Sequence, residues 1–463
     1  MAKTSNDALL YDLSPLEPLP SASPRAWLRW AFGSLFVYLL LYNLPFPLEL
    51  LPYQGDGEPL APLREWLLIY TQAKTDTITW FGTKVLRLEN VAPVSSGSGD
   101  TLFDYVQCAT FASAALLLGA LYLLLDQRGR MMRFLHAMLR IHLRYVLAAT
   151  LLGYGFHKVF PLQFGELDGE RLYGTYGSAS PMNLLWTFLS ASPAYTVFSG
   201  GMEVLGGLLL LFRRTTTLGA LVSIAVLGNV AMLNYCYDVP VKLYSSHLLF
   251  MAIVLLAKDA RRLLAVLLTN QPTTPTVLRR PLPMWFLVPI QIVKLALAGW
   301  IIWTAAAPNY EAYRQRGSNP PAFGGIWETT EFSLVAAEGK AAAPSEHWHH
   351  VVVQRYDPKQ PTYVTVSRLG YSKQTYTMTV DAERHVWTLT PVGKEAGAPL
   401  ELTYAERTVE ATETTPARKE VELSGTIAGS ALRAVLQPRD PASFPIHNRG
   451  FHWVQEYPYN SNR

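Results

Sequence analysis

Cysteine and charge are both scarce in this chain of 463 residues, which has two cysteines and 16% charged residues. Two cysteines exclude a disulfide-framework fold, although Cys108 and Cys236 both lie at or beside apolar runs and could form one pair. A charged fraction well below the ~25% of soluble domains favours a chain that is partly embedded in lipid. The net charge of +4 is small, and the basic residues lie between apolar runs, so we expect no nucleic-acid partner.

Long apolar runs occupy residues 27–306 and almost disappear afterwards. A helix of roughly 20 apolar residues crosses a membrane, and the candidate segments are 31–51, 106–126, 141–160, 195–212, 216–235, 244–257 and 284–306. The N-terminus lacks the layout of a cleaved signal peptide, so we expect the first run to remain as a span. The sequence therefore predicts a cytoplasmic segment, 1–26, followed by a transmembrane helical domain, 27–306.

Basic clusters alternate with these spans and predict their orientation. They precede the first span and follow the second, fourth and sixth spans, whereas the opposite loops are richer in acid. Because basic loops remain in the cytoplasm, seven spans predict a cytoplasmic N-terminus and an outward C-terminal domain. The outer loops 52–105 and 161–194 are unusually long, and the first contains an amphipathic stretch, 63–88. The basic residues include Arg25, Arg29, Arg128, Arg130, Arg213, Arg214, Arg279 and Arg280.

Residues 307–463 have a different pattern. Segments such as HHVVVQRY, TYVTVSRL and HVWTLT alternate apolar and polar residues between turn residues. This alternation predicts strands, and roughly eight of them predict a small antiparallel barrel or sandwich. The fold class is therefore a mainly α-helical membrane bundle of about seven spans with a C-terminal all-β domain. We expect the terminal segment, 448–456, to be packed rather than loose.

Three histidines of the β domain, His347, His349 and His350, invite a metal interpretation. On a strand, His347 and His349 share one face and His350 points to the other. Because no third ligand lies nearby in sequence, we predict no metal site.

Glu203 lies near the middle of the fourth apolar run. A carboxylate at that depth costs about 2.5 kcal/mol or more to insert, so it faces protein or a wet cavity and often marks function. Gly200 and Gly207 share its helical face, which favours close helix contact. We expect Glu203 to face the bundle interior near Lys158 or Lys242, because an ion pair would offset the insertion cost.

Other polar residues gather near the outer ends of the predicted spans. Tyr154 and Lys158 share a helical face, and a lysine there either extends its amine to the interface or, if buried, can act as a base or nucleophile. Asp238 and Lys242 have the spacing of an ion pair. These residues form either a structural polar network or a pocket that handles protons or ligands. In addition to Lys158, the members are Tyr154, His157, Asp100, Asn229, Asn234, Asp238, Lys242 and His247.

Two segments, GYGFHKVF and EVLGGLLLLFRRTTTLGAL, carry a further pattern. It consists of Gly-x-x-Lys at a span end, Glu-x-x-Gly-Gly-x-Leu-Leu-Leu, an arginine turn and a Gly-Ala-Leu span. In these respects residues 140–257 resemble the DoxX family of bacterial membrane proteins. The matching residues are Gly155, Lys158, Glu203, Gly206, Gly207, Arg213, Arg214, Gly219 and Ala220. The chain departs from compact DoxX proteins in its size, its long 161–194 loop, its extra spans and its β domain.

The resemblance implies a four-helix unit in a bacterial inner (cytoplasmic) membrane. With the predicted orientation, the β domain is periplasmic or extracellular. Some DoxX relatives are subunits of quinone-linked oxidoreductases, and many have no assigned role. Residues 154–177 also faintly resemble, in spacing alone, the transmembrane domain of vitamin-K-dependent carboxylase relatives.

Three functions remain open, so the sequence does not decide whether the protein is an enzyme. The first is a membrane scaffold that binds lipid or a membrane or periplasmic protein. The second is a component of a quinone-linked oxidoreductase, with Glu203 relaying a proton. No haem, flavin or iron–sulfur motif is present, so it would need a quinone or a partner for electrons. The third is a lysine-based, carboxylase-like enzyme with Lys158 as base. Glu203 and Lys158 are the catalytic candidates.

Overall fold

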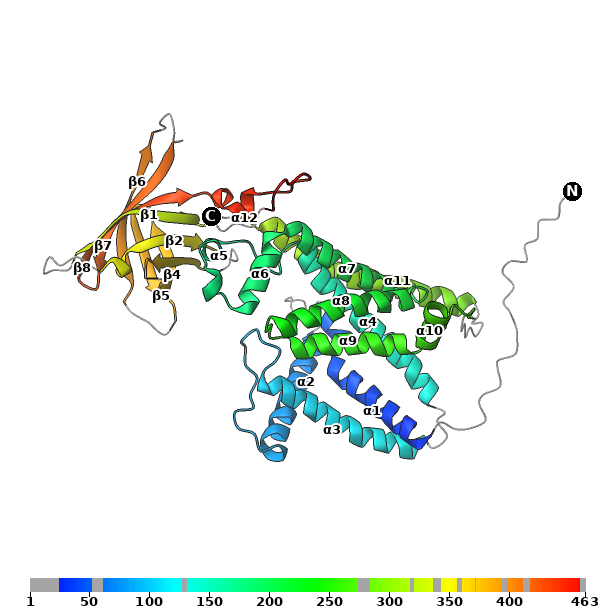
Figure 1. The fold of residues 1–463 in the computed structure, drawn as a ribbon. Helices are drawn as coiled ribbons and strands as arrows, with labels where there is room; N and C mark the ends of the chain where they lie inside the picture. The colour runs from blue at the N-terminus through cyan, green and yellow to red at the C-terminus, as the bar shows by residue number, and fades with distance from the viewer. Residues whose placement is uncertain are drawn as a thin grey trace. The chain divides into compact units, whose positions relative to one another are not determined.

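The computed structural model describes residues 25–51, 61–126, 131–273, 284–316, 320–335, 343–355, 360–370, 372–393, 398–410 and 417–458. Most of the predicted N-terminal segment lies outside these ranges, as do Arg128, Arg130, Arg279 and Arg280 of the basic clusters. The secondary structure changes from helix to strand between Gln315 and Gly325 (Figure 1). The chain divides into a first unit (1–150, 206–235, 239–283) and a second unit (151–205, 236–238, 284–463). The second unit therefore joins helices to the β domain.

The helical part includes every segment predicted to span a membrane. Its helices are α1 (Ala26–Asn43), α2 (Ala61–Trp80), α3 (Leu102–Leu125), α4 (Met132–Val159), α5 (Gly169–Leu172), α6 (Pro181–Ala191), α7 (Pro193–Leu211), α8 (Thr216–Cys236), α9 (Lys242–Ala257), α10 (Ala260–Thr269) and α11 (Met284–Gln315). Shorter turns are η1 (Leu48–Leu50), η4 (Tyr176–Ser178) and a π-helical turn, η3 (Phe81–Val85). The predicted amphipathic stretch is α2 together with η3.

Five helical segments among the described residues are long and apolar enough to cross a membrane: Ala26–Leu50, Leu102–Leu125, Pro193–Leu211, Thr216–Cys236 and Val288–Gln315. The predicted count of seven is therefore matched only roughly. α9 is apolar but has 16 residues, and the N-terminal half of α4 carries Arg140 and Arg144. Five such helices nevertheless indicate a membrane protein.

Small residues bring α1 and α3 close together in the first unit. A Cβ atom on Gly119 would lie 2.1 Å from Ser34 Oγ and 2.8 Å from Ser34 N. A Cβ atom on Gly33 would lie 2.5 Å from the ring of Tyr122. Membrane helices associate through such close van der Waals packing because lipid supplies no hydrophobic driving force between them.

The C-terminal domain is a closed antiparallel barrel in which each strand pairs with the next and β8 pairs with β1. This topology confirms the predicted all-β domain, and of the two predicted architectures, a barrel or a sandwich, the domain is a barrel. The strands are β1 (Gly325–Val335), β2 (Trp348–Gln354), β3 (Thr362–Arg368), β4 (Lys373–Asp381), β5 (Val386–Pro391), β6 (Leu400–Val409), β7 (Arg418–Ile427) and β8 (Ser430–Arg439). Inward side chains such as Val351, Val353, Trp387 and Leu402 fill the interior, so the barrel is a packed core.

The helix α5 covers part of the outer face of this barrel, within the second unit. Gly169 lies directly on β1 and β2: a Cβ atom there would meet Val352 Cγ2 at 2.6 Å and Ile326 Cγ1 at 2.8 Å. Glu170 accepts a hydrogen bond of 2.7 Å from the Thr365 hydroxyl of β3. Because of this cover, Val352 is buried although its strand neighbours Val351 and Val353 point into the core.

Residues 448–456 are exposed except for half-buried Arg449, so the prediction of a packed terminal segment is wrong. The turn η6 (Pro441–Ser443) and the short helix α12 (Pro445–Asn448) follow the barrel, and Phe451 to Pro458 are all exposed. Strand side chains already fill the barrel interior, which leaves no core position for these aromatic residues.

Candidate functional site

Lys158, near the end of α4, and Glu203, in the middle of α7, form an ion pair within the second unit. The Lys158 ammonium donates a hydrogen bond to Glu203 Oε1. The exposed fractions of the two residues are 6% and 2%. The predicted contact of Glu203 with one of the two lysines is therefore confirmed, with Lys158 as the partner. As a neutral pair, the two residues avoid most of the cost of placing one charge in an apolar bundle.

Two glycines allow α4 and α7 to approach closely enough to form this pair. A Cβ atom on Gly155 would lie 2.9 Å from both Gly200 O and Val204 N. A Cβ atom on Gly200 would lie 2.6 Å from Gly155 O and 2.6 Å from Lys158 Cβ. The predicted close contact at Gly200 is thus confirmed, and the contacted atoms are mostly backbone atoms that cannot move aside independently.

The second carboxylate oxygen of Glu203 sets the chemistry that this pair can perform. Glu203 Oε2 is buried and has no hydrogen-bond partner among the described residues, so it can still accept a proton or a hydrogen bond. Lys158, in contrast, is held as a paired ammonium and must lose a proton before it could act as a base or nucleophile.

The neighbours of Lys158 on α4 have different environments. His157 Nδ1 lies 2.7 Å from Asn309 Oδ1 of α11, and Asn309 Nδ2 donates a 2.7 Å bond to Ala305 O. This contact links α4 to α11, and the sequence reasoning missed Asn309. Tyr154, one turn before Lys158, has an exposed fraction of 45%.

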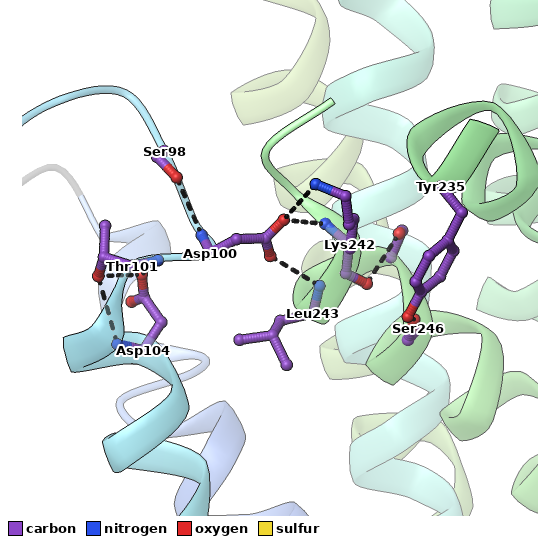
Figure 2. Close-up of polar contacts among 9 residues, drawn as sticks. Ser98, Asp100, Thr101, Asp104, Tyr235, Lys242, Leu243 and Ser246 are labelled. Atoms are coloured by element: carbon purple, nitrogen blue, oxygen red, sulfur yellow. Dashed lines mark hydrogen bonds and ion pairs between the residues drawn. The ribbon is translucent and has the colours of Figure 1, made fainter. Parts of the chain in front are cut away.

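Asp100 and Lys242 belong to a separate cluster, within the first unit (Figure 2). Asp100 accepts hydrogen bonds from Lys242 N (2.8 Å) and Leu243 N (2.9 Å), and its carboxylate lies 3.6 Å from Lys242 Nζ. It therefore caps the N-terminus of α9 from a segment 142 residues away, where the helix dipole favours negative charge. The adjacent Thr101 and Asp104 form a capping box at the start of α3.

The other members of the predicted network have separate environments. Asn234 is buried in α8, and its Nδ2 atom has no hydrogen-bond partner in the described part of the chain. Asn229 is exposed on the same helix. Asp238 is exposed and has a positive φ of 51° in the turn before α9. Cys108 and Cys236 are both free.

His247 of α9 lies in an aromatic cluster that the sequence reasoning missed. Its Nδ1 donates to Leu243 O (2.7 Å), so its Nε2 accepts from the Tyr38 hydroxyl (2.6 Å) in the neutral ring. The ring of Tyr42 stacks on His247 at a centroid distance of 4.0 Å. The signal in the sequence was the spacing of Tyr38 and Tyr42, which places both rings on one face of α1.

A cavity of about 270 Å³ lies beside this cluster, also in the first unit. Its lining includes Tyr42, Phe46, Glu49, Thr150 and Tyr244. The volume is slightly below the roughly 300–1,000 Å³ of typical small-molecule sites. It could therefore hold a small group rather than a whole large cofactor.

The histidines of β2 support the attachment of α5 to the barrel. The ring of Tyr173, which follows α5, stacks on buried His350 at 4.1 Å, and its hydroxyl donates to Glu328 of β1. His349 Nδ1 lies 2.9 Å from His350 Nδ1. Burial, with smaller effects from His349 and Lys373, lowers the pKa of His350 to about 4. Among the described residues, no group of three or more His, Cys, Asp or Glu side chains could hold a metal ion.

The lowered pKa of His350 predicts that the contact between Tyr173 and His350 is sensitive to acid. An unfolded histidine has a pKa near 6.5, so the unfolded chain binds the proton more readily between about pH 6.5 and 4. Stability is therefore full above about pH 6.5 and falls as the pH drops towards 4, by up to about 3 kcal/mol. We expect the pH dependence of the unfolding midpoint of the full-length protein to become flatter in His350→Gln.

His347→Gln provides the matched control, because His347 lies next to the same strand and is only partly buried. It should retain the acid sensitivity of the wild type. Equal slopes for wild type and His350→Gln over the range from about pH 4 to 6.5 would show that His350 does not control this contact.

Among known proteins, the chain is similar to the uncharacterized protein YwoB of Bacillus subtilis (strain 168). The two are 30% identical over 157 residues, which are 34% of this chain and 100% of YwoB. No family model matches the chain, and no solved structure matches it. Since the chain covers the whole of YwoB at this identity, the protein belongs to the same family as YwoB.

Proposed function

We propose that this protein is a scaffold of the bacterial cytoplasmic membrane, in which the helices hold the β-barrel outside the membrane for a partner protein. In this proposal the N-terminus is cytoplasmic and the barrel is periplasmic or extracellular, as the distribution of basic residues indicates. The DoxX resemblance of residues 140–257 is consistent with a bacterial membrane location. The helical domain then serves as an anchor, and the barrel carries the binding surface.

The attachment of α5 to the barrel is the observation that carries this proposal. A barrel that needed only a tether would require a single linker, such as the connection between α11 and β1. Here a second segment, from the 161–194 loop, covers the outer face of β1–β3 through Gly169 and the Glu170–Thr365 hydrogen bond. Arg316, after α11, also pairs with Glu166 of that loop at 2.9 Å. Two attachments hold the orientation of the barrel, as presentation to a partner requires.

The contrast between the two sides of the barrel suggests where a partner binds. Part of the outer face of β1–β3 is covered by α5, whereas outward residues of β6 such as Glu401, Thr403 and Ala405 are exposed. A partner would therefore contact the β6 side. The Lys158–Glu203 pair has a structural role in this proposal, since its two charges neutralise each other inside the bundle.

A component of a quinone-linked oxidoreductase is the second candidate. It is favoured by Glu203 Oε2, which is buried without a hydrogen-bond partner among the described residues and could take up a proton. The lysine-based enzyme is the least supported candidate, because the Lys158 amine is already paired with a carboxylate.

Site-specific photocrosslinking in cells distinguishes the first two candidates. A photoreactive residue at Thr403 should capture a discrete partner protein, and the same residue at Arg261, in the predicted cytoplasmic connection, should not. The double variant Lys158→Met/Glu203→Leu should retain the Thr403 product, because it keeps the pair neutral. A fusion of alkaline phosphatase to the C-terminus should be active.

Two results together would favour the oxidoreductase. The photoreactive residue at Thr403 would give no specific crosslinked product, and a quinone would copurify with the wild type but not with the folded Glu203→Gln variant. An inactive phosphatase fusion would overturn the outward orientation and with it the scaffold proposal.

A further inference from the structure

The C-terminal tail exposes an unusual number of large apolar side chains. The exposed fractions are 77% for Phe451, 91% for Trp453, 76% for Val454 and 84% for Tyr457. These residues lie close together in the chain, and the rings of Phe451 and Trp453 are in contact at 5.0 Å. Scattered exposed apolar residues are ordinary, whereas a contiguous group of this kind marks a contact surface.

The register of the barrel fixes the place where this tail begins. Arg439, the last residue of β8, pairs with Ile326 at the beginning of β1. β1 follows the apolar helix α11, with only residues 316–324 between them. The tail therefore leaves the barrel at the end where the chain arrives from a candidate membrane span.

A second contact holds the root of the tail at that end. Phe444 packs edge-to-face against Tyr173 at 5.2 Å, and the Arg439 guanidinium lies 5.4 Å above the Phe444 ring. Tyr173 belongs to the loop between α4 and α6. This loop, α6 and the adjoining parts of α4 (151–159) and α7 (193–205) belong to the same unit as the barrel. Two segments thus lie at this end of the barrel: the connection that follows α11 and the loop that carries Tyr173. Both come from the helical domain.

The composition of the tail selects the chemistry of its partner. Residues 450–458 (GFHWVQEYP) contain one carboxylate and no Lys or Arg, which does not favour a strongly charged partner. Trp and Tyr have an apolar body and a polar tip, and they are enriched at the boundary between lipid headgroups and water.

We propose that residues 451–457 form a membrane-interface anchor that inserts Phe451, Trp453 and Tyr457 among the lipid headgroups on the barrel side of the membrane. The partner is the lipid surface itself, contacted through apolar rings rather than through charge. This contact would hold the free end of the barrel chain against the bilayer. It requires the helices to span a membrane, but it does not require the barrel to bind a protein.

The test measures the depth of the tail in a bilayer. In the full-length protein, Cys108 and Cys236 are replaced by Ala, and Val454→Cys provides a single site for a spin label. The labelled protein is reconstituted into phosphatidylcholine nanodiscs. We expect collisions with oxygen, which dissolves in lipid, to exceed collisions with a water-soluble nickel chelate several-fold. A label at Leu369→Cys, in the turn at the opposite end of the barrel, should show the reverse. Adding phosphatidylglycerol should change neither result, because the contact is apolar.

Two variants connect the depth to the aromatic residues. Trp453→Ser should shift the Val454 label towards the nickel chelate, while Tyr176→Ser, which removes an exposed aromatic residue elsewhere, should not. A wild-type Val454 label that is as accessible to nickel as the Leu369 label would overturn the proposal. Low accessibility to both reagents would also overturn it, since it would show burial against protein. These readouts use purified protein alone, so they are independent of any crosslinked partner.

Discussion

Replacing Lys158 with Met should destabilise the folded protein by about 3–5 kcal/mol, the range measured when one member of a buried ion pair is removed. The reason is that Glu203 would remain buried in α7 without its partner, and its second carboxylate oxygen has no hydrogen-bond partner among the described residues. Protonation of Glu203 would limit the loss but not abolish it. The free energy of unfolding in mixed detergent micelles, followed by helical circular dichroism, measures this effect.

The double variant Lys158→Met/Glu203→Leu separates the pair from the packing. Because well-packed apolar residues can replace a buried ion pair at little cost, the double variant should regain most of the stability that Lys158→Met loses. Two equal and additive losses would instead show that each side chain acts independently. A wild-type stability for Lys158→Met alone would mean that the pair contributes nothing to the fold.

Substituting Leu at Gly200 should also be strongly destabilising, because the new side chain would collide with backbone atoms of α4. Its Cβ atom alone would lie 2.6 Å from Gly155 O and 2.9 Å from Val159 N. Overpacking typically costs about 1–3 kcal/mol, and a rigid backbone contact places this substitution at or above the upper end. We expect a large loss of folded protein in size-exclusion chromatography, with the same outcome for Gly155→Leu.

Neighbouring glycines supply matched controls for this prediction. At Gly201 and Gly153, a Cβ atom would meet nothing within 4 Å, so Leu should be tolerated at both. Similar losses for Gly200→Leu and Gly201→Leu would mean that the helix, rather than its contact with α4, is sensitive. Combining Gly200→Leu with Lys158→Met should be less than additive, since either change breaks the ion pair.

The elements that follow from local pattern could be predicted from the sequence. The period-two alternation of the C-terminal third predicts its strands, and the long apolar runs predict the helices. The inward position of Glu203 follows from the cost of a carboxylate in lipid, and an ion pair with Lys158 or Lys242 is one way to offset that cost. The three-dimensional structure was needed to show that such a pair forms and that Lys158 is the partner.

Contacts between distant segments were the part that the sequence could not supply. Asp100 reaches α9 across 142 residues, and no local spacing indicates such a cap. The position of Gly169 on Val352 and Ile326 likewise depends on how a loop between helices meets a sheet. Packing of the terminal aromatic residues is the ordinary expectation for apolar side chains, but the barrel has no space left for them.

The pairing of β8 with β1 has a consequence for how the protein is made. A chain leaving the ribosome completes β1 long before β8, so the barrel cannot close until the chain is synthesised through Arg439. Until then β1 and the newest strand both present unpaired hydrogen-bonding edges, which are prone to associate with other chains. Early insertion of the helices would keep each nascent barrel attached to its own membrane domain and apart from its neighbours during that interval.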